Sequence, residues 1–143
     1  MAQANITEGL AQVDLFSGLS QRNLARIARS GREVDHKPGK EVVTQGRGGI
    51  AFHLVLGGSA DLEIGGQLRK RLDAGDYFGE ISLLDGKPRT ATVRAGGDGL
   101  RTFAITAWEF QALLKEQPRI ARALLVTLCA RIRDTQEASG VAR

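Results

Sequence analysis

The residues best able to do chemistry lie in one glycine-containing stretch, Tyr77–Val93. It places Glu80 directly after Gly79, and Arg89 directly after a proline. Backbone amides that open a short helix after Gly79 would be unpaired donors at a positive dipole end, which suits a phosphate. Arg89 can add a planar, bidentate fork to the same phosphate, and Glu80 can accept a hydrogen bond from a ribose-type hydroxyl. The stretch therefore predicts a site for a ligand that is both anionic and hydroxylated.

Other kinds of chemistry find less support. Taken alone, a glutamate and an arginine nine positions apart, such as Glu80 and Arg89, more often form a structural ion pair at the end of a sheet. The sequence has two histidines, His36 and His53, which fall in different predicted strands without a carboxylate at ligand spacing. We therefore predict no metal site and no catalytic nucleophile–base set, hence no enzyme. A cupin-like metal enzyme is a remote alternative, because it would need several histidines that converge on one end of a roll.

Composition predicts one soluble globular domain over residues 1–143. The 18 glycines and 3 prolines, without a repeat, indicate tight turns between short strands. A net charge of +4 raises nucleic acid as a partner, but the basic residues are scattered and aromatics make up only 5% of the chain. We expect no specific nucleic acid binding. The sequence shows no membrane span and no secretory signal, so we expect a cytoplasmic protein.

The elements around the chemical stretch follow an order of helix, β-roll and helix. Residues 5–30 have apolar residues at helical spacing, with a break at Ser17-Gly18, a cap at Ser20 and a stop at Gly31. Residues 32–106 alternate short apolar runs with turn signals, as a sandwich or roll does. Strands are predicted at Arg32–His36, Glu41–Thr44, Ala51–Leu56, Ser59–Ile64, Gln67–Leu72, Thr90–Ala95 and Leu100–Thr106.

Glycine clusters mark most of the predicted turns. Gly57-Gly58 and Gly96–Gly99 are each expected to separate two strands, and Gly65-Gly66 to close a hairpin, because both of its turn positions can take positive φ. Residues 107–137 return to helical spacing, with Pro118 at the start of the last helix. That helix carries an apolar row, and the thiol of Cys129 is expected to be packed and inert. The row consists of Ile120, Leu124, Leu128 and Ile132.

The run FGEISLLDGKPRTATV, residues 78–93, closely resembles the phosphate-binding cassette of the cyclic-nucleotide-binding domain family. The resemblance extends to LFSGLSQRNLARIA, KPGKEVVTQG, HLVLGGSADLEI and LDAGDYFGE. It implies a mainly β fold, a double-stranded β-helix or jelly-roll-like β-roll, with amino-terminal helices and a carboxy-terminal lid helix. The chain departs from the family at Arg47–Ile50, where the family usually has acidic residues.

The resemblance also implies roles for individual residues. Glu80 would bind the ribose 2′-hydroxyl and Arg89 the cyclic phosphate, while Leu62 and Leu72 would face the purine. Ser82 and Thr90 would complete the phosphate and ribose contacts, and Arg131 or Thr135 would cap the base. The implied ligand-binding set is Leu62, Leu72, Phe78, Gly79, Glu80, Ile81, Ser82, Arg89, Thr90, Arg131 and Thr135.

The function implied by the resemblance is that of a sensor without a cofactor. Its ligand would be cAMP or cGMP, with a lean toward cAMP, and its output would be movement of the last helix toward an effector protein or a second copy. Catabolite-activator-type regulators carry a DNA-reading unit after this domain, and here the chain ends about one helix after the roll. A fragment of a larger transcription factor, kinase or channel is the alternative, whereas Met1 favours a complete small protein. A degenerate domain used only for protein contacts is disfavoured by Glu80 and Arg89.

Overall fold

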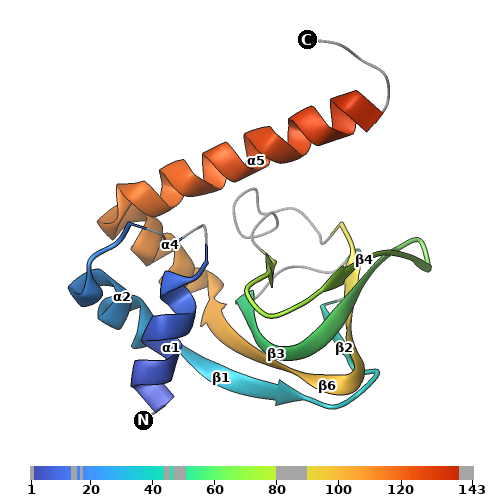
Figure 1. The fold of residues 1–143 in the computed structure, drawn as a ribbon, viewed down its shortest axis with the longest axis horizontal. Helices are drawn as coiled ribbons and strands as arrows, with labels where there is room; N and C mark the ends of the chain where they lie inside the picture. The colour runs from blue at the N-terminus through green and yellow to red at the C-terminus, as the bar shows by residue number, and fades with distance from the viewer. Residues whose placement is uncertain are drawn as a thin grey trace.

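The structure, a computed structural model, describes residues 2–13, 16, 18–43, 46, 51–79 and 90–138. Helices precede and follow a run of strands, and in Figure 1 α1, α2 and α4 gather at one end of the sheet while α5 extends along the roll. The elements are α1 (Ala2–Ala11), α2 (Gln21–Ala28), β1 (Gly31–His36), β2 (Glu41–Val43), β3 (Ala51–Ile64), β4 (Gln67–Leu72), β5 (Tyr77–Phe78), β6 (Thr92–Thr106), α4 (Ala107–Glu116) and α5 (Pro118–Ala138).

The described strands form one antiparallel sheet around the long pair β3 and β6. The path runs β1-β6-β3-β4, with β2 paired to β6 and β5 paired to β3. The hairpin between β3 and β4 turns at Gly65-Gly66, where φ is 60° and 80°. The predicted hairpin is therefore confirmed, and so is the mainly β class.

The predicted turns at Gly57-Gly58 and Gly96–Gly99 are wrong. Both glycine clusters lie inside continuous strands, and Gly58 pairs with Leu100 across the β3–β6 ladder. The register shifts on either side of Gly58, so the glycines form bulges that let the two strands bend together. A Cβ added to Gly58 would overlap the carbonyl oxygen of Gly99, which explains why a side chain is excluded there.

One smaller expectation also needs correction. Gly31 does not end a helix, because α2 already ends at Ala28 and Gly31 begins β1. A Cβ on Gly31 would overlap the carbonyl oxygen of Ala104 on β6, so this glycine is needed for close strand approach. The predicted cap at Ser20 is confirmed, since its Oγ accepts a hydrogen bond of 3.1 Å from the Asn23 amide. The short strand β5 was not expected, because two residues are too few to show a period.

The sheet divides the described apolar side chains into two clusters. Successive residues of a strand face opposite sides, so Phe52 and Leu54 of β3 pack toward the helices while Val55 faces the inside of the roll. The helix-side cluster also receives side chains from α1, α2, α4 and α5. The cluster inside the roll consists of Val55, Ala60, Leu72, Phe78, Val93, Ala95 and Leu100.

The last helix is buried in the core at its beginning. Ile120 and Leu124 of α5 are buried in the helix-side cluster, whereas Ile132 is 57% exposed. The prediction of a packed Cys129 thiol is wrong, because this side chain is exposed on the part of α5 that lies beyond the core. None of the helices in the described part of the chain has the length and apolar composition needed to cross a membrane.

Candidate functional site

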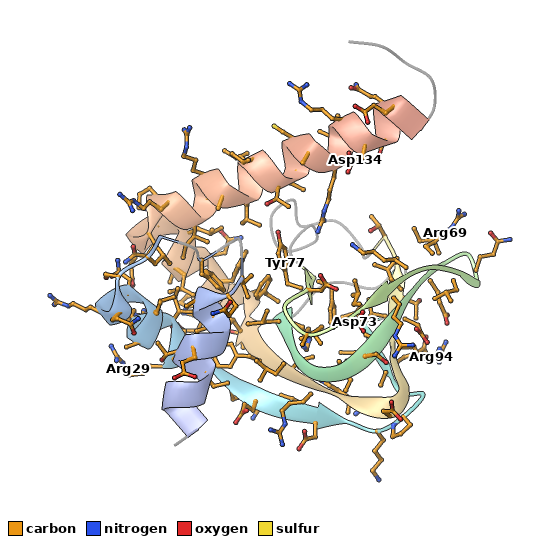
Figure 2. All side chains as sticks on the ribbon, in the orientation of Figure 1. Arg29, Arg69, Asp73, Tyr77, Arg94 and Asp134 are labelled. Atoms are coloured by element: carbon orange, nitrogen blue, oxygen red, sulfur yellow. The ribbon has the colours of Figure 1, made fainter. Side chains whose placement is uncertain are left out.

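A cavity of about 780 Å³ lies between the roll and the second half of α5. Its lining comes from β2, β3, β4, β5, β6 and α5, so it exists only in the folded chain. Figure 2 shows Tyr77 of β5 pointing toward α5, and Asp134 on that helix. The volume falls within the range of about 300–1,000 Å³ that is typical of small-molecule sites.

Every predicted site residue that the structure describes lines this one cavity. These residues come from four elements and from the segments after β5 and before β6. The remaining predicted residues, Glu80, Ile81, Ser82 and Arg89, lie outside the described residues. The seven that line the cavity are Leu62, Leu72, Phe78, Gly79, Thr90, Arg131 and Thr135.

One wall of the cavity is the apolar inside of the roll. Leu72 and Phe78 are 3% and 4% exposed, and Leu62 packs against the same cluster. These side chains are therefore both part of the core and part of the cavity wall. Lys70 lies opposite Leu62 in the β3–β4 ladder and also lines the cavity, so a cation is present beside this apolar surface.

Gly79 follows β5 with a positive φ of 97°. Residues other than glycine pay roughly 1–2 kcal/mol for left-handed backbone, so a glycine is favoured at this position. The structure thus supplies a conformational reason for the glycine that precedes Glu80. Gly79 itself lines the cavity.

One face of α5 forms the opposite wall. Thr127, Arg131, Asp134 and Thr135 are spaced by four, three and one residues, which places them on one side of a helix. The Arg131 guanidinium lies 5.8 Å from the centre of the Tyr77 ring, in a cation–π arrangement. The Thr135 hydroxyl donates to the carbonyl oxygen of Arg131 at 3.0 Å, and its oxygen keeps lone pairs for a further donor.

Sequence reasoning missed several residues of the lining. Thr127 and Asp134 could have been found from helical spacing around Arg131, and Tyr77 from its place next to Phe78. Ala91 and Val93 lie within the cassette run and could have been included on that ground. Strand pairing brings in Val43, Ile64 and Lys70, and the chain between elements brings in Gln12, Gly75 and Asp76, neither of which leaves a local signal. The missed lining residues are Gln12, Val43, Ile64, Lys70, Gly75, Asp76, Tyr77, Ala91, Val93, Thr127 and Asp134.

The sequence also matches a family model. The model for the cyclic nucleotide-binding domain matches residues 33–117, more than half of the chain. The chain therefore belongs to the cyclic nucleotide-binding domain family, and the family expected from the cassette is confirmed.

Individual relatives include regulatory proteins of different kinds. The chain is 36% identical over 106 residues to a cAMP-dependent protein kinase regulatory subunit of Mycosarcoma maydis, a match that covers 70% of the chain and 20% of that protein. It is 36% identical over 86 residues to a cGMP-dependent protein kinase of Toxoplasma gondii, covering 60% of the chain and 9% of that protein. The chain thus spans a fifth or less of these relatives.

Among solved structures, the chain is similar to the catabolite activator protein of Thermus thermophilus. The TM-score is 0.81 at 30% sequence identity, and the match covers 89% of this chain and 62% of that one. This similarity confirms the β-roll fold with flanking helices.

Proposed function

We propose that this chain binds a cyclic nucleotide monophosphate, cAMP in preference to cGMP, in the cavity under α5, and that it acts as a regulatory module in the cytoplasm. One observation carries the proposal. Seven residues that the cassette and its family resemblance single out, scattered from Leu62 to Thr135, line a single cavity of suitable size. A chance arrangement would not bring positions so far apart in sequence to one surface.

The roles follow from the chemistry of each wall. The purine lies against the apolar inside of the roll, at Leu62 and Leu72. Arg89 pairs with the cyclic phosphate and Glu80 accepts from the ribose 2′-hydroxyl, as the resemblance of the cassette implies. Arg131 and Thr135 cap the base from α5. The net charge of +4 adds a general attraction for an anionic ligand.

The preference for cAMP rests on Thr135 and on the similarity to the cAMP-dependent protein kinase regulatory subunit. The Thr135 hydroxyl donates its hydrogen bond to the Arg131 carbonyl oxygen, so its own oxygen faces a ligand as an acceptor. An acceptor suits the exocyclic amino group of adenine, whereas the corresponding position of guanine is a carbonyl. The cAMP-dependent relative agrees with this choice. cGMP is the second candidate, supported by Thr90 in the cassette and by the cGMP-dependent relative.

The output of binding is a change in the position of α5. A ligand can shift this helix only if the closed arrangement binds it more tightly than the open one. Side chains on α5 that touch the base supply that difference. The partner that reads the helix is an effector protein or a second copy of the chain. Because the relatives are several times longer than this chain, the module also fits the role of one domain within a larger regulator, kinase or channel.

Calorimetry with the full chain tests the proposal. We expect binding of cAMP, weaker binding of cGMP, and a loss of about tenfold or more in Arg89→Ala, since a charge-assisted contact contributes about 1.5–3 kcal/mol. Glu80→Gln is expected to cost less and to weaken discrimination against 2′-deoxy-cAMP. Arg69→Ala, an exposed cation of β4 outside the cavity lining, is the control. Absence of binding at submillimolar nucleotide, or normal binding by a folded Arg89→Ala variant, would contradict the proposal.

A further inference from the structure

A buried polar cluster lies inside the roll, next to the apolar cluster. His36 of β1, His53 of β3 and Thr102 of β6 are all less than 9% exposed. His36 Nε2 lies 3.0 Å and His53 Nδ1 lies 3.1 Å from the same Thr102 Oγ1. The two imidazole rings are 5.8 Å apart and meet edge to face. One hydroxyl therefore links two histidines across three strands.

This histidine–threonine cluster reaches the wall of the nucleotide cavity. The His53 ring stacks on the Phe78 ring, with centres 4.9 Å apart and planes 10° apart. The backbones of His53 and Phe78 are also paired, as β5 joins β3. Phe78 lines the cavity, and Gly79 follows it directly. A continuous row of contacts thus runs from His36 through Thr102 and His53 to Phe78.

The number of protons in the cluster is limited. The Thr102 hydroxyl has one proton and can donate it to only one of the two ring nitrogens. The other ring nitrogen must then donate its own N–H to Oγ1. In that arrangement one of the two facing nitrogens is unprotonated, and adding a proton to it forces the Thr102 hydroxyl to turn its own proton away from both rings. One histidine cation is compatible with this arrangement, whereas a second would place two positive rings 5.8 Å apart on one hydroxyl, and this repulsion breaks the cluster.

The surroundings of the cluster oppose protonation. Burial lowers the pKa of His36, Lys40 lowers it further, and Asp35 acts in the opposite direction. Asp35 and Glu33 of β1 both pair with Arg101 of β6, at 3.2 and 3.9 Å, so one guanidinium offsets part of their negative charge.

Among the described residues, Asp98 of β6 adds one further carboxylate to the groove around His36. The residues that α1 and β3 contribute to this wall are uncharged: Ile6, Gly9, Leu56, Gly57 and Gly58.

From this geometry, and on the basis of the proposed nucleotide site, we infer that His53 is a positioning residue for Phe78, held by Thr102 and His36, and that protonation of the histidine pair weakens nucleotide binding. In the neutral cluster His53 is fixed on both sides, by Thr102 and by the Phe78 ring. When the cluster breaks, the stacked support of Phe78 is lost, and the cavity wall next to Gly79 loses its fixed position. Nucleotide affinity then falls as the solution becomes mildly acidic.

The sequence makes this inference sharply testable. His36 and His53 are its only histidines. Histidine is the side chain whose ordinary pKa, about 6.5, lies between pH 7.5 and 5.5, so this range covers its titration. We would measure the Kd for cAMP across this range by displacement of a fluorescent analogue. The Kd of the unaltered chain should rise about tenfold, the effect of one unit of pKa difference between free and bound protein.

Variants separate positioning from a general effect on the core. The double variant His36→Gln/His53→Asn, whose amides can still hydrogen-bond to Thr102, should show a flat pH profile. Ser59→Ala, which alters a buried polar residue outside the cluster, should keep the wild-type profile. A pH-independent Kd in the unaltered chain, an unchanged slope in the double variant, or tighter binding at acid pH would overturn the inference.

A measurement on the ligand-free chain distinguishes failure of this inference from failure of the proposed function. The backbone amide signals of Phe78 and Gly79 should shift in NMR spectra with the same midpoint as the histidine ring signals. If cAMP does not bind at pH 7.5, the proposed function fails, and this titration still decides whether the pair controls Phe78. Histidine signals that titrate while both amides stay unchanged would overturn the positioning role.

Discussion

Arg131 shows how a single side chain can serve both the helix and the site. It lies on the face of α5 that lines the cavity, and its guanidinium lies over the Tyr77 ring. Its aliphatic stem can cover an apolar base while its charged end reaches polar atoms at the edge. The same contact ties the second half of α5 to the roll. A ligand that enters the cavity therefore meets a side chain that already bridges the two walls.

The prediction at the scale of residues concerns Arg131. Arg131→Ala should weaken cAMP binding about two- to fivefold, because a cation–π contact at an exposed site contributes about 0.5–1 kcal/mol. Arg133 is the matched control, since it is an exposed arginine of the same helix that does not line the cavity. Displacement of a fluorescent cAMP analogue measures both variants. Equal losses in the two variants would mean that only the general positive charge of α5 matters.

At the scale of elements, α5 consists of an anchored half and an overhanging half. Its beginning is buried through Ile120 and Leu124, whereas Leu125, Val126 and Ile132 are exposed. Few buried contacts mean low local stability, so the overhanging half is the part that a ligand can order. The cavity-lining face of α5 begins at Thr127, where the core contacts end. The part of α5 with the fewest buried contacts is thus the part that faces the cavity.

Amide hydrogen exchange tests this division of α5. With cAMP bound, we expect slower exchange across residues 128–137 and across the cassette, residues 78–93. Residues 118–124 serve as an internal control and should change little, because they are already buried. Protection that rises in the cassette but stays unchanged across residues 128–137 would make the chain a binder without a lid, and the proposed output would have to be abandoned.

At the scale of the whole molecule, the buried histidines connect stability to pH. The pKa of His36 is lower in the folded protein than its ordinary value near 6.5. Between the two pKa values the unfolded chain binds more protons, so the free energy of unfolding rises with pH in that window. The contribution of His36 to the free energy of unfolding is therefore fully present above about pH 6.5. It is lost as the pH falls through the folded-state pKa.

Chemical denaturation of the ligand-free chain at pH 7.5, 6.5 and 5.5 checks this expectation. The free energy of unfolding should fall from pH 6.5 to 5.5, and His36→Gln should remove part of the fall, since glutamine does not titrate. The midpoints must be compared at equal ionic strength, because the surface pairs of Arg101 depend on salt. A free energy of unfolding that is the same at pH 7.5 and 5.5 would show that burial of His36 has no energetic effect.

Local chemistry explains what the sequence by itself determined. A serine before a helix, a proline in a first turn and two glycines between short strands act within a few residues of themselves, and the elements at Ser20, Pro118 and Gly65-Gly66 were predicted correctly. The cassette is also contiguous, so its residues and the family could be read from the chain alone. The predicted residues that the structure describes then proved to share one cavity.

Only the tertiary structure decided the features that depend on a partner far along the chain. Gly57-Gly58 and Gly96–Gly99 resemble turns in sequence, and they are bulges because each lies against the other in the β3–β6 pair. Cys129 sits in an apolar run, yet it is exposed because α5 extends past the core. His36 and His53 showed no ligand spacing, and they meet because pairing of distant strands brings both to Thr102. Burial and shared hydrogen bonds arise from long-range packing, which no local pattern records.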